Sequence, residues 1–306
     1  MIKPAILHSG DKVAVVAPAS PFDRELFDRG LAELRTIGLD PVFDPSVFER
    51  HWYLAGAASV RAAALRSAWQ DPSIRAIFAA RGGYGSMQLL PWLDPVEMRE
   101  APKAFVGYSD VTSIHVFLAS MCGLVSVHGP MMTSLARGAE GYDRGSLQAT
   151  LMRAEPLGEL TAEAVEALNP GEAMGVLLGG TLTQLLTSMG TPYAFDPPRG
   201  YVLLLDEVAE RPYRLDRLLT QLRQTGLLAK AAAVVCAQFP DCDDPSGEPS
   251  GRAVIAEHLR HFPGPVIFGF PTGHVTGAMR TVPLGVAARV VANGRPRLIV
   301  EEAAVS

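Results

Sequence analysis

Short apolar runs alternate with amphipathic stretches along the first half of the chain. Residues 12–18 (KVAVVAP) form an apolar run that favours a β-strand and ends at a proline. Residues 22–38 repeat apolar side chains at helical spacing, with a glycine at the expected end of the helix. Two further apolar runs, at residues 74–85 and 103–110, each lead into a polar turn. Alternating strands and helices of this kind predict a parallel sheet with right-handed crossovers.

The second half of the chain repeats this alternation and ends differently. Residues 201–210 (YVLLLDEVAE) predict a buried strand that ends in acidic residues. Residues 211–226 predict an amphipathic helix whose inner face carries Tyr213 and four leucines. Near the C-terminus, Asn293 and Gly294 separate two apolar runs, which is typical of a β-hairpin.

The periodicity weakens between residues 131 and 171, where glycine and charged residues are frequent. We therefore expect an α/β fold with two domains. The N-terminal α/β domain, built on a parallel sheet, would span residues 1–150, and residues 151–171 would form a linker. Residues 172–306 would form a smaller C-terminal α/β domain that is rich in strands.

Composition and charge limit the possible environments and partners. Hydrophobic residues make up 48% of the 306 residues and charged residues 19%, so the chain can bury real cores. The net charge of −5 leaves no basic surplus for nucleic acid. No apolar stretch approaches the length of about 18 residues that a membrane span needs. Three scattered cysteines and the lack of a signal-peptide pattern predict a cytoplasmic protein without disulfides or a membrane anchor.

Ser109 lies in the segment GYSD, between a predicted buried strand and a predicted helix. A serine in such a turn has an exposed hydroxyl, and the next backbone N–H is free at the start of the helix. The usual GxSxG pattern is incomplete, because Val111 occupies the last position. The alternative is that Ser109 or Asp110 merely caps the helix.

The segment RGGYG, residues 81–85, follows another predicted strand. The N–H groups of Gly82 and Gly83, together with that of Asp110, would suit an oxyanion hole. The spacing does not match the GxGxxG fingerprint of a dinucleotide site, and an ordinary turn is the alternative.

His274 stands between glycines in FPTGHVTG, a loop that suits a histidine acting as a general base. Asp206 and Glu207 end a buried strand, where a carboxylate can orient an imidazole or be solvated. Cysteine and acidic residues near Cys242 match no standard zinc spacing, so no metal site is expected.

Seven segments in this order resemble the LD-carboxypeptidases, serine peptidases of bacterial murein recycling whose relatives include the microcin C immunity peptidases. These segments are GDKVAVVAPAS, RGGYGSMQLLPWLD, FVGYSDVTSIHVFL, HGPMM, GGTLTQLLTSMGTPY, LLLDEVAERPYRLDRLLTQL and FGFPTGHVTG. The resemblance spans nearly the whole chain, and the ordered set is far more specific than any single motif.

The resemblance implies a triad of serine, histidine and an acid, with Ser109 as nucleophile and His274 as base. The family usually reads Glu-Asp where this chain has Asp206-Glu207, and the glutamate is the triad acid there. Alignment without a gap gives the role to Asp206, with Glu207 as the fallback. The active site would lie between the two domains, and the protein would be a homodimer.

The resemblance also implies the reaction, which is release of terminal D-alanine from a murein tetrapeptide through an acyl-enzyme, without a cofactor. Tyr84 and the arginines Arg81, Arg214 and Arg280 are candidates for binding the substrate, since Arg can pair with its free carboxylate. The alternatives are a microcin C-type immunity peptidase that cleaves an aminoacyl-nucleotide amide, and a non-catalytic murein-peptide binding protein.

Overall fold

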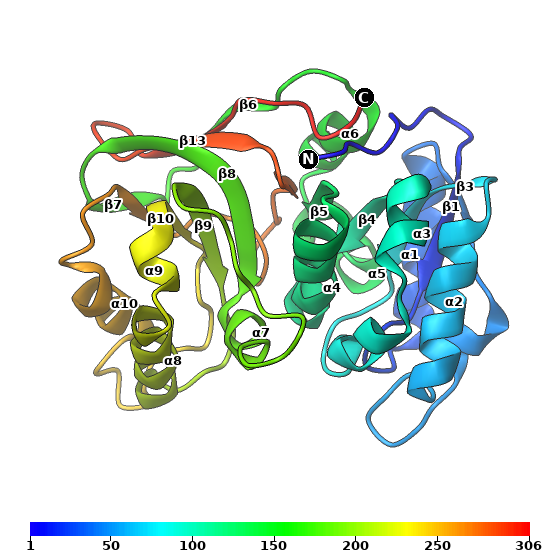
Figure 1. The fold of residues 1–306 in the computed structure, drawn as a ribbon, viewed down its shortest axis with the longest axis horizontal. Helices are drawn as coiled ribbons and strands as arrows, with labels where there is room; N and C mark the ends of the chain where they lie inside the picture. The colour runs from blue at the N-terminus through cyan, green and yellow to red at the C-terminus, as the bar shows by residue number, and fades with distance from the viewer.

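The computed structural model describes residues 1–306 and contains two β-sheets with helices packed against them (Figure 1). The first sheet has six strands in the order β12-β5-β4-β3-β1-β2. Neighbours are parallel except β12, which is antiparallel to β5. The strands are β1 (Lys12–Val16), β2 (Asp40–Val42), β3 (Ile74–Ala79), β4 (Ala104–Gly107), β5 (Ser126–His128) and β12 (Val282–Leu284). The predicted parallel N-terminal sheet is therefore confirmed.

Both faces of the first sheet are buried, which explains why its strands are continuous apolar runs. Val13 and Val15 of β1 face one core, whereas Ala14 and Val16 face the other. The α-helices that cover these faces are α1 (Arg24–Thr36), α2 (Ala58–Gln70), α3 (Pro95–Glu100), α4 (Thr112–Phe117), α5 (Met132–Leu135) and α6 (Arg144–Met152). Short irregular helices are η1 (Pro45–Phe48), η2 (Ser86–Trp92), η3 (Ser109–Val111), η4 (Leu118–Cys122) and η5 (Gly138–Glu140).

The second sheet has eight strands in the order β6-β14-β13-β8-β9-β10-β11-β7. Four central strands are parallel: β8 (Glu172–Thr181), β9 (Tyr201–Asp206), β10 (Ala231–Cys236) and β11 (Val266–Phe268). Antiparallel strands flank them: β6 (Gly158–Leu160), β7 (Glu166–Asn169), β13 (Ala287–Val291) and β14 (Arg297–Val300). The helices of this unit are α7 (Leu182–Thr187), α8 (Pro212–Gln224), α9 (Leu227–Lys230) and α10 (Gly251–Leu259). The predicted hairpin is confirmed as β13 and β14.

Two expectations from the sequence need correction. Residues 151–171, expected as a linker, contain β6 and β7, which form the two outer strands of the second sheet. Tyr213, expected on the inner face of its helix, is 60% exposed, and the guanidinium groups of Arg214 and Arg217 lie near its ring. The domain boundaries themselves stay predictions.

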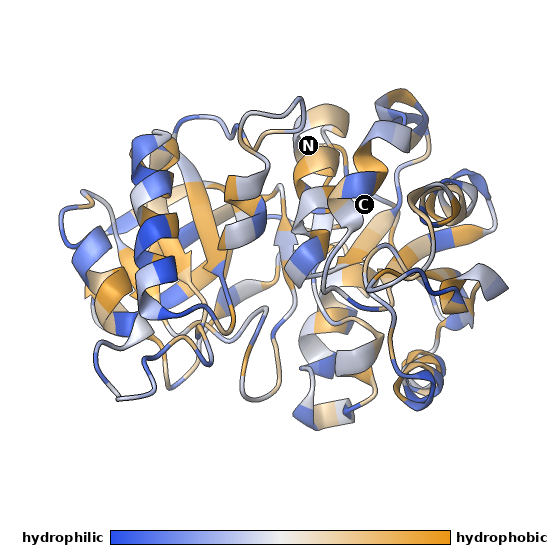
Figure 2. Cartoon of the chain, turned by 90° about the horizontal axis from the view of Figure 1, so that it is seen from below, coloured by the Kyte–Doolittle hydropathy of each residue, from blue (hydrophilic) through white to orange (hydrophobic).

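Apolar residues concentrate in the strands at the centre of each unit, and polar residues lie mainly on the outer helices (Figure 2). No helix is both long and apolar enough to cross a membrane. Cys122, Cys236 and Cys242 are buried free thiols.

The two units meet along α4 and α7, which lie between the sheets (Figure 1). The backbone N–H of Thr181 donates to Thr112 Oγ1 at 3.1 Å, and the side chain of Gln184 donates to Asp110 Oδ1 at 3.1 Å. The loop after β11 also connects the units, because it runs from the second sheet to β12 of the first. The ends of β3, β4, β8 and β9 are thereby held around one junction.

Candidate active site

Ser109 occupies a sharp turn between β4 and α4. Its φ of +67° is unusual for a residue with a side chain, whereas Tyr108 before it is extended. Such a conformation costs about 1–3 kcal/mol and persists only where the surrounding structure imposes it. The turn matches the geometry of a nucleophile elbow, in which the hydroxyl points out of the sheet.

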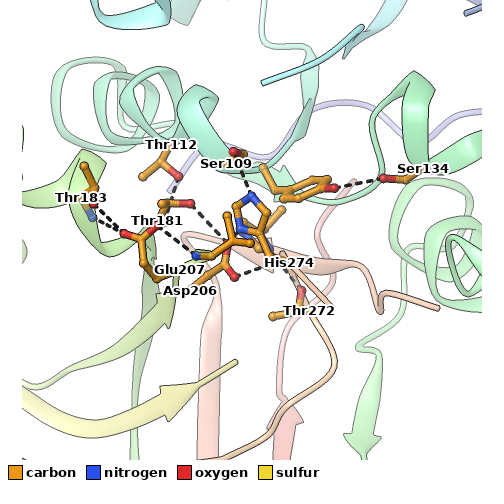
Figure 3. Close-up of polar contacts among 12 residues, drawn as sticks. Ser109, Thr112, Ser134, Thr181, Thr183, Asp206, Glu207, Thr272 and His274 are labelled. Carbon is orange, nitrogen blue, oxygen red and sulfur yellow. Dashed lines mark hydrogen bonds and ion pairs between the residues drawn. The ribbon is translucent and has the colours of Figure 1, made fainter. Parts of the chain in front are cut away.

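The Ser109 hydroxyl is directed at His274 and does not cap the following helix. Ser109 Oγ lies 3.0 Å from His274 Nε2 (Figure 3). No side-chain hydrogen bond caps α4, and the Asp110 carboxylate accepts instead from the Ser86 N–H at 2.8 Å. The capping alternative is therefore not what the structure shows for either residue.

Asp206 contacts the side of the His274 ring that faces away from Ser109 and fixes the orientation of the ring (Figure 3). His274 Nδ1 lies 2.7 Å from Asp206 Oδ2, and the His274 backbone N–H donates to Oδ1 at 2.9 Å. Since a carboxylate only accepts, Nδ1 carries the proton, and Nε2 is left to accept from Ser109. Thr181 Oγ1, at 3.3 Å from Oδ2, is a further donor.

The loop reaches Asp206 because a glycine precedes His274. Gly273 has a φ of +69°, and a Cβ on it would lie 2.4 Å from the Asp206 carboxyl carbon. A side chain at this position would therefore be strained and would push the loop away from the carboxylate.

Glu207 makes different contacts, although it adjoins Asp206. Its Oε2 accepts from the Thr183 N–H at 2.9 Å and from Thr183 Oγ1 at 2.7 Å, and Oε1 accepts from the Val208 N–H. Burial raises the pKa of Glu207. Of the two acids suggested by the sequence, only Asp206 is hydrogen-bonded to His274.

The buried pair has shifted pKa values. Burial by itself opposes the charged forms of both groups, but their mutual attraction and hydrogen bonds outweigh it. The pKa of His274 is consequently raised, and the pKa of Asp206 is lowered. Asp206 is thus held as a carboxylate that favours a positive charge on the imidazole.

The glycine loop lies directly beside Ser109. A Cβ on Gly82 would be 3.0 Å from Ser109 Oγ and 3.3 Å from the Asp110 nitrogen. Gly83 instead lies against Ser20, and a Cβ there would meet Ser20 Oγ at 2.5 Å. The backbone of Gly82 and the N–H of Asp110 therefore border the hydroxyl.

Arg61, which the sequence analysis missed, anchors this loop from within the protein. It is only 2% exposed, and its guanidinium donates to the carbonyls of Pro18, Gly56 and Gly85 and to the side chain of Gln88. A buried guanidinium needs such partners, so it fixes the segments on both sides of the loop. In an alanine-rich helix, nothing in the sequence distinguishes it from a surface arginine.

The structure gives each of the other residues that the sequence suggested for substrate binding its own surroundings. Arg81 is exposed and donates to the Pro21 carbonyl at 2.7 Å, and Tyr84 is 52% exposed. Arg214 donates to the hydroxyl of Tyr213 on α8, and its guanidinium lies 3.9 Å from Glu210, which precedes that helix. The Arg280 backbone N–H donates to Pro271 in the His274 loop.

A cavity of about 370 Å³ adjoins His274 and contains an arginine that the sequence analysis did not select. Its lining includes Tyr108, Arg137, Asp241 and His274. Arg137 is exposed and comes from the glycine-rich segment in which periodicity was weak. No group of three or more His, Cys, Asp or Glu side chains in the chain could hold a metal ion.

Comparisons with known proteins identify the family of the chain. The family models of the LD-carboxypeptidase N-terminal and C-terminal domains match residues 13–129 and 174–290. A putative carboxypeptidase of Streptomyces coelicolor is 41% identical over 96% of this chain and 94% of its own. A probable murein peptide carboxypeptidase of Bacillus subtilis is 33% identical over 99% and 95% of the two chains.

Solved structures show the same two-domain α/β fold. The muramoyltetrapeptide carboxypeptidase of Oxalobacter formigenes has a TM-score of 0.83 at 27% identity, covering 95% of this chain and 99% of its own. The microcin C7 self-immunity protein, in the wild-type apo state, has a TM-score of 0.92 at 22% identity over 100% of both chains. The chain belongs to the LD-carboxypeptidase family of serine-type peptidases.

Proposed function

We propose that the protein is a serine carboxypeptidase that releases terminal D-alanine from murein tetrapeptides by hydrolysing the L,D-amide bond. The hydrogen-bonded series Ser109–His274–Asp206 is the observation that carries this proposal. In this series the serine hydroxyl can donate to the imidazole, and the imidazole to the carboxylate, as nucleophilic acyl transfer requires. The murein peptide carboxypeptidase among the relatives supports the choice of substrate.

The reaction would proceed in two acyl-transfer steps. His274 Nε2 takes the hydroxyl proton while Ser109 Oγ attacks the carbonyl carbon of the scissile amide. His274 then protonates the leaving amine, D-alanine departs, and an ester to Ser109 remains. Water, deprotonated by the same imidazole, hydrolyses this ester and restores the hydroxyl. Asp206 holds the imidazole in the required tautomer throughout and stabilises its charged form.

Backbone N–H groups of Asp110 and of Gly82 or Gly83 would stabilise the oxyanion of each tetrahedral intermediate. Each such donor can contribute about 3–4 kcal/mol to the transition state. The buried contacts of Arg61 and Asp110 support this role, because they hold the donors in place before substrate binds.

The free carboxylate of the substrate needs a cation near the scissile bond. Arg137 is suitably placed, because its side chain lines the cavity that His274 also lines. Arg81, proposed from the sequence, contacts a backbone carbonyl, and Arg214 contacts Glu210 and Tyr213, its neighbours in sequence. We therefore add Arg137 as the leading candidate for this contact.

Cytoplasmic location and a homodimer are also proposed, both from the family resemblance. The fold likeness to the microcin C7 immunity protein makes an aminoacyl-nucleotide amide the competing substrate. A murein-peptide binding protein without turnover is the third candidate function. Assays with both substrates separate these three functions.

Ser109→Ala tests the reaction and its nucleophile together. Purified protein is incubated with a murein tetrapeptide and, separately, with an aspartyl-adenylate amide analogue, and products are read by mass spectrometry. We expect the tetrapeptide to lose one alanine residue, and Ser109→Ala to slow this by a factor on the order of 10⁶. Cleavage of the nucleotide alone would favour the competing function. Binding of tetrapeptide without turnover would favour the binding protein.

The pH dependence tests the role of the acid. The base must be neutral, so kcat/KM rises with pH through the raised pKa of His274. Asp206→Asn removes the charge that raises this pKa, so the midpoint moves to lower pH and kcat falls roughly 10⁴-fold. Glu207→Gln is the matched control: it lowers the midpoint less than Asp206→Asn does, because the charge of Glu207 raises the pKa of His274 less than Asp206 does. It keeps most of the rate because Glu207 contacts Thr183. A larger loss of kcat and a larger shift of the midpoint in Glu207→Gln than in Asp206→Asn would make Glu207 the acid that orients His274.

Gly273→Ala tests whether activity depends on the close approach of the His274 loop to Asp206. The added methyl displaces the loop from Asp206, and misplacing the base in this way lowers kcat about 10²-fold. Gly277→Ala in the same loop is the control, because a Cβ there meets no heavy atom within 4 Å. Equal activity of the two variants in a steady-state assay would contradict the argument.

A further inference from the structure

A row of aromatic side chains lies on the surface next to the glycine loop. It consists of His51, Trp52, Tyr53 and Tyr84, and we call it the aromatic row. Trp52, Tyr53 and Tyr84 are 80%, 57% and 52% exposed. The ring centroids of Tyr84 and Tyr53 are 5.5 Å apart, those of Tyr53 and Trp52 6.3 Å, and His51 stacks on Trp52 at 4.5 Å. The rings thus form one continuous exposed surface.

The backbone presents Trp52 to solvent in an unfavourable conformation. Trp52 has a φ of +54°, which is rare for a bulky residue. It lies at the tip of a tight turn closed by two hydrogen bonds of 2.9 Å between His51 and Leu54. Leu54 is buried and anchors the turn, whereas Trp52 contributes little to any core. Neither the strain nor the exposure of this large ring stabilises the fold, so the position indicates a binding role.

The aromatic row begins at the candidate active site. Tyr84 is two residues from Gly82, whose backbone borders the Ser109 hydroxyl. Ser20 ties the two positions together, since its N–H donates to the Gly82 carbonyl and its Oγ accepts from the Tyr84 N–H. Tyr84 lies two residues, at most about 7 Å, from Gly82, and three extended peptide residues span roughly 10 Å. A peptide acylated at Ser109 can therefore bring its amino end to Tyr84, and a group attached to that end can extend along the row toward Trp52.

We propose that the aromatic row is a subsite for the muramoyl sugar at the amino end of the murein peptide. This inference rests on the proposed function and adds the form of the substrate. A pyranose ring has apolar C–H faces, and flat aromatic rings offer large, rigid contact areas for them at low entropic cost. The polar rims of Tyr53, Tyr84 and His51 can hydrogen-bond the sugar hydroxyl and acetamido groups. The protein would thus act best on peptides that still carry this sugar.

Trp52→Ala tests the subsite by comparing two substrates, the free tetrapeptide and N-acetylmuramoyl-tetrapeptide. We expect kcat/KM for the muramoyl substrate to fall about tenfold through KM, while the free peptide changes less than about twofold. Trp92→Ala is the matched control, since Trp92 is also exposed and lies outside the row. Equal losses on both substrates, or no loss on either, would overturn the proposal.

A binding measurement gives a second readout that needs no turnover. In a Ser109→Ala background, titration with muramoyl-tetrapeptide should change the fluorescence of Trp52, and Trp52→Ala should abolish this change. A fluorescence change produced only by the aspartyl-adenylate analogue would instead make the row a nucleobase subsite. A shift in oligomeric state of Trp52→Ala on light scattering would make it an interface between copies. Failure of the proposed function is distinct, because the parent protein would then cleave neither murein substrate.

Discussion

The buried carboxylate of Asp206 is the constraint on which the site depends. A fully buried charge is costly unless it is paired and hydrogen-bonded. Asp206 meets this need with two N–H groups of one residue, the backbone and ring of His274. The same contacts that stabilise the charge therefore place Nε2 toward Ser109. Since Gly273 leaves no room for a side chain, the loop and the carboxylate determine each other's position.

This arrangement couples the site to the docking of the two units. Ser109 follows β4 of the first sheet, Asp206 ends β9 of the second, and the loop of His274 connects both sheets through β11 and β12. Thr181 contributes to the junction as well, donating through its hydroxyl to Asp206 and through its N–H to Thr112. A shift between the units would break the series at the Ser109–His274 contact first, because that contact crosses between β4 and the loop. The geometry of the site is therefore a property of the whole chain and of neither sheet alone.

The sequence predicted the parts of the structure that depend on local pattern. Apolar runs identified the buried strands, and residues at the ends of these strands included Ser109 and Asp206. The choice between Asp206 and Glu207 could not be made from periodicity, because adjacent residues at a strand end point in different directions. Family alignment favoured Asp206, and the hydrogen bonds agree with it. Residues 151–171 were misjudged because β6 and β7 are short outer strands with few buried side chains, which leave almost no hydrophobic pattern.

Arg61 and Arg137 show why the remaining site residues were not predictable. Their roles arise from tertiary placement: Arg61 is surrounded by three carbonyls from separate segments, and Arg137 reaches the cavity beside His274. Neither environment produces a residue spacing that could be recognised as a motif in a single sequence. The two flanks of Ser109 also differ in chemistry, with Arg137 and Asp241 in the cavity and aromatic rings beyond the glycine loop. An enzyme that removes one terminal residue must distinguish the two ends of its substrate. On our proposals, charge selects the carboxylate end and flat apolar surface selects the glycan end, so one peptide direction is favoured at the nucleophile.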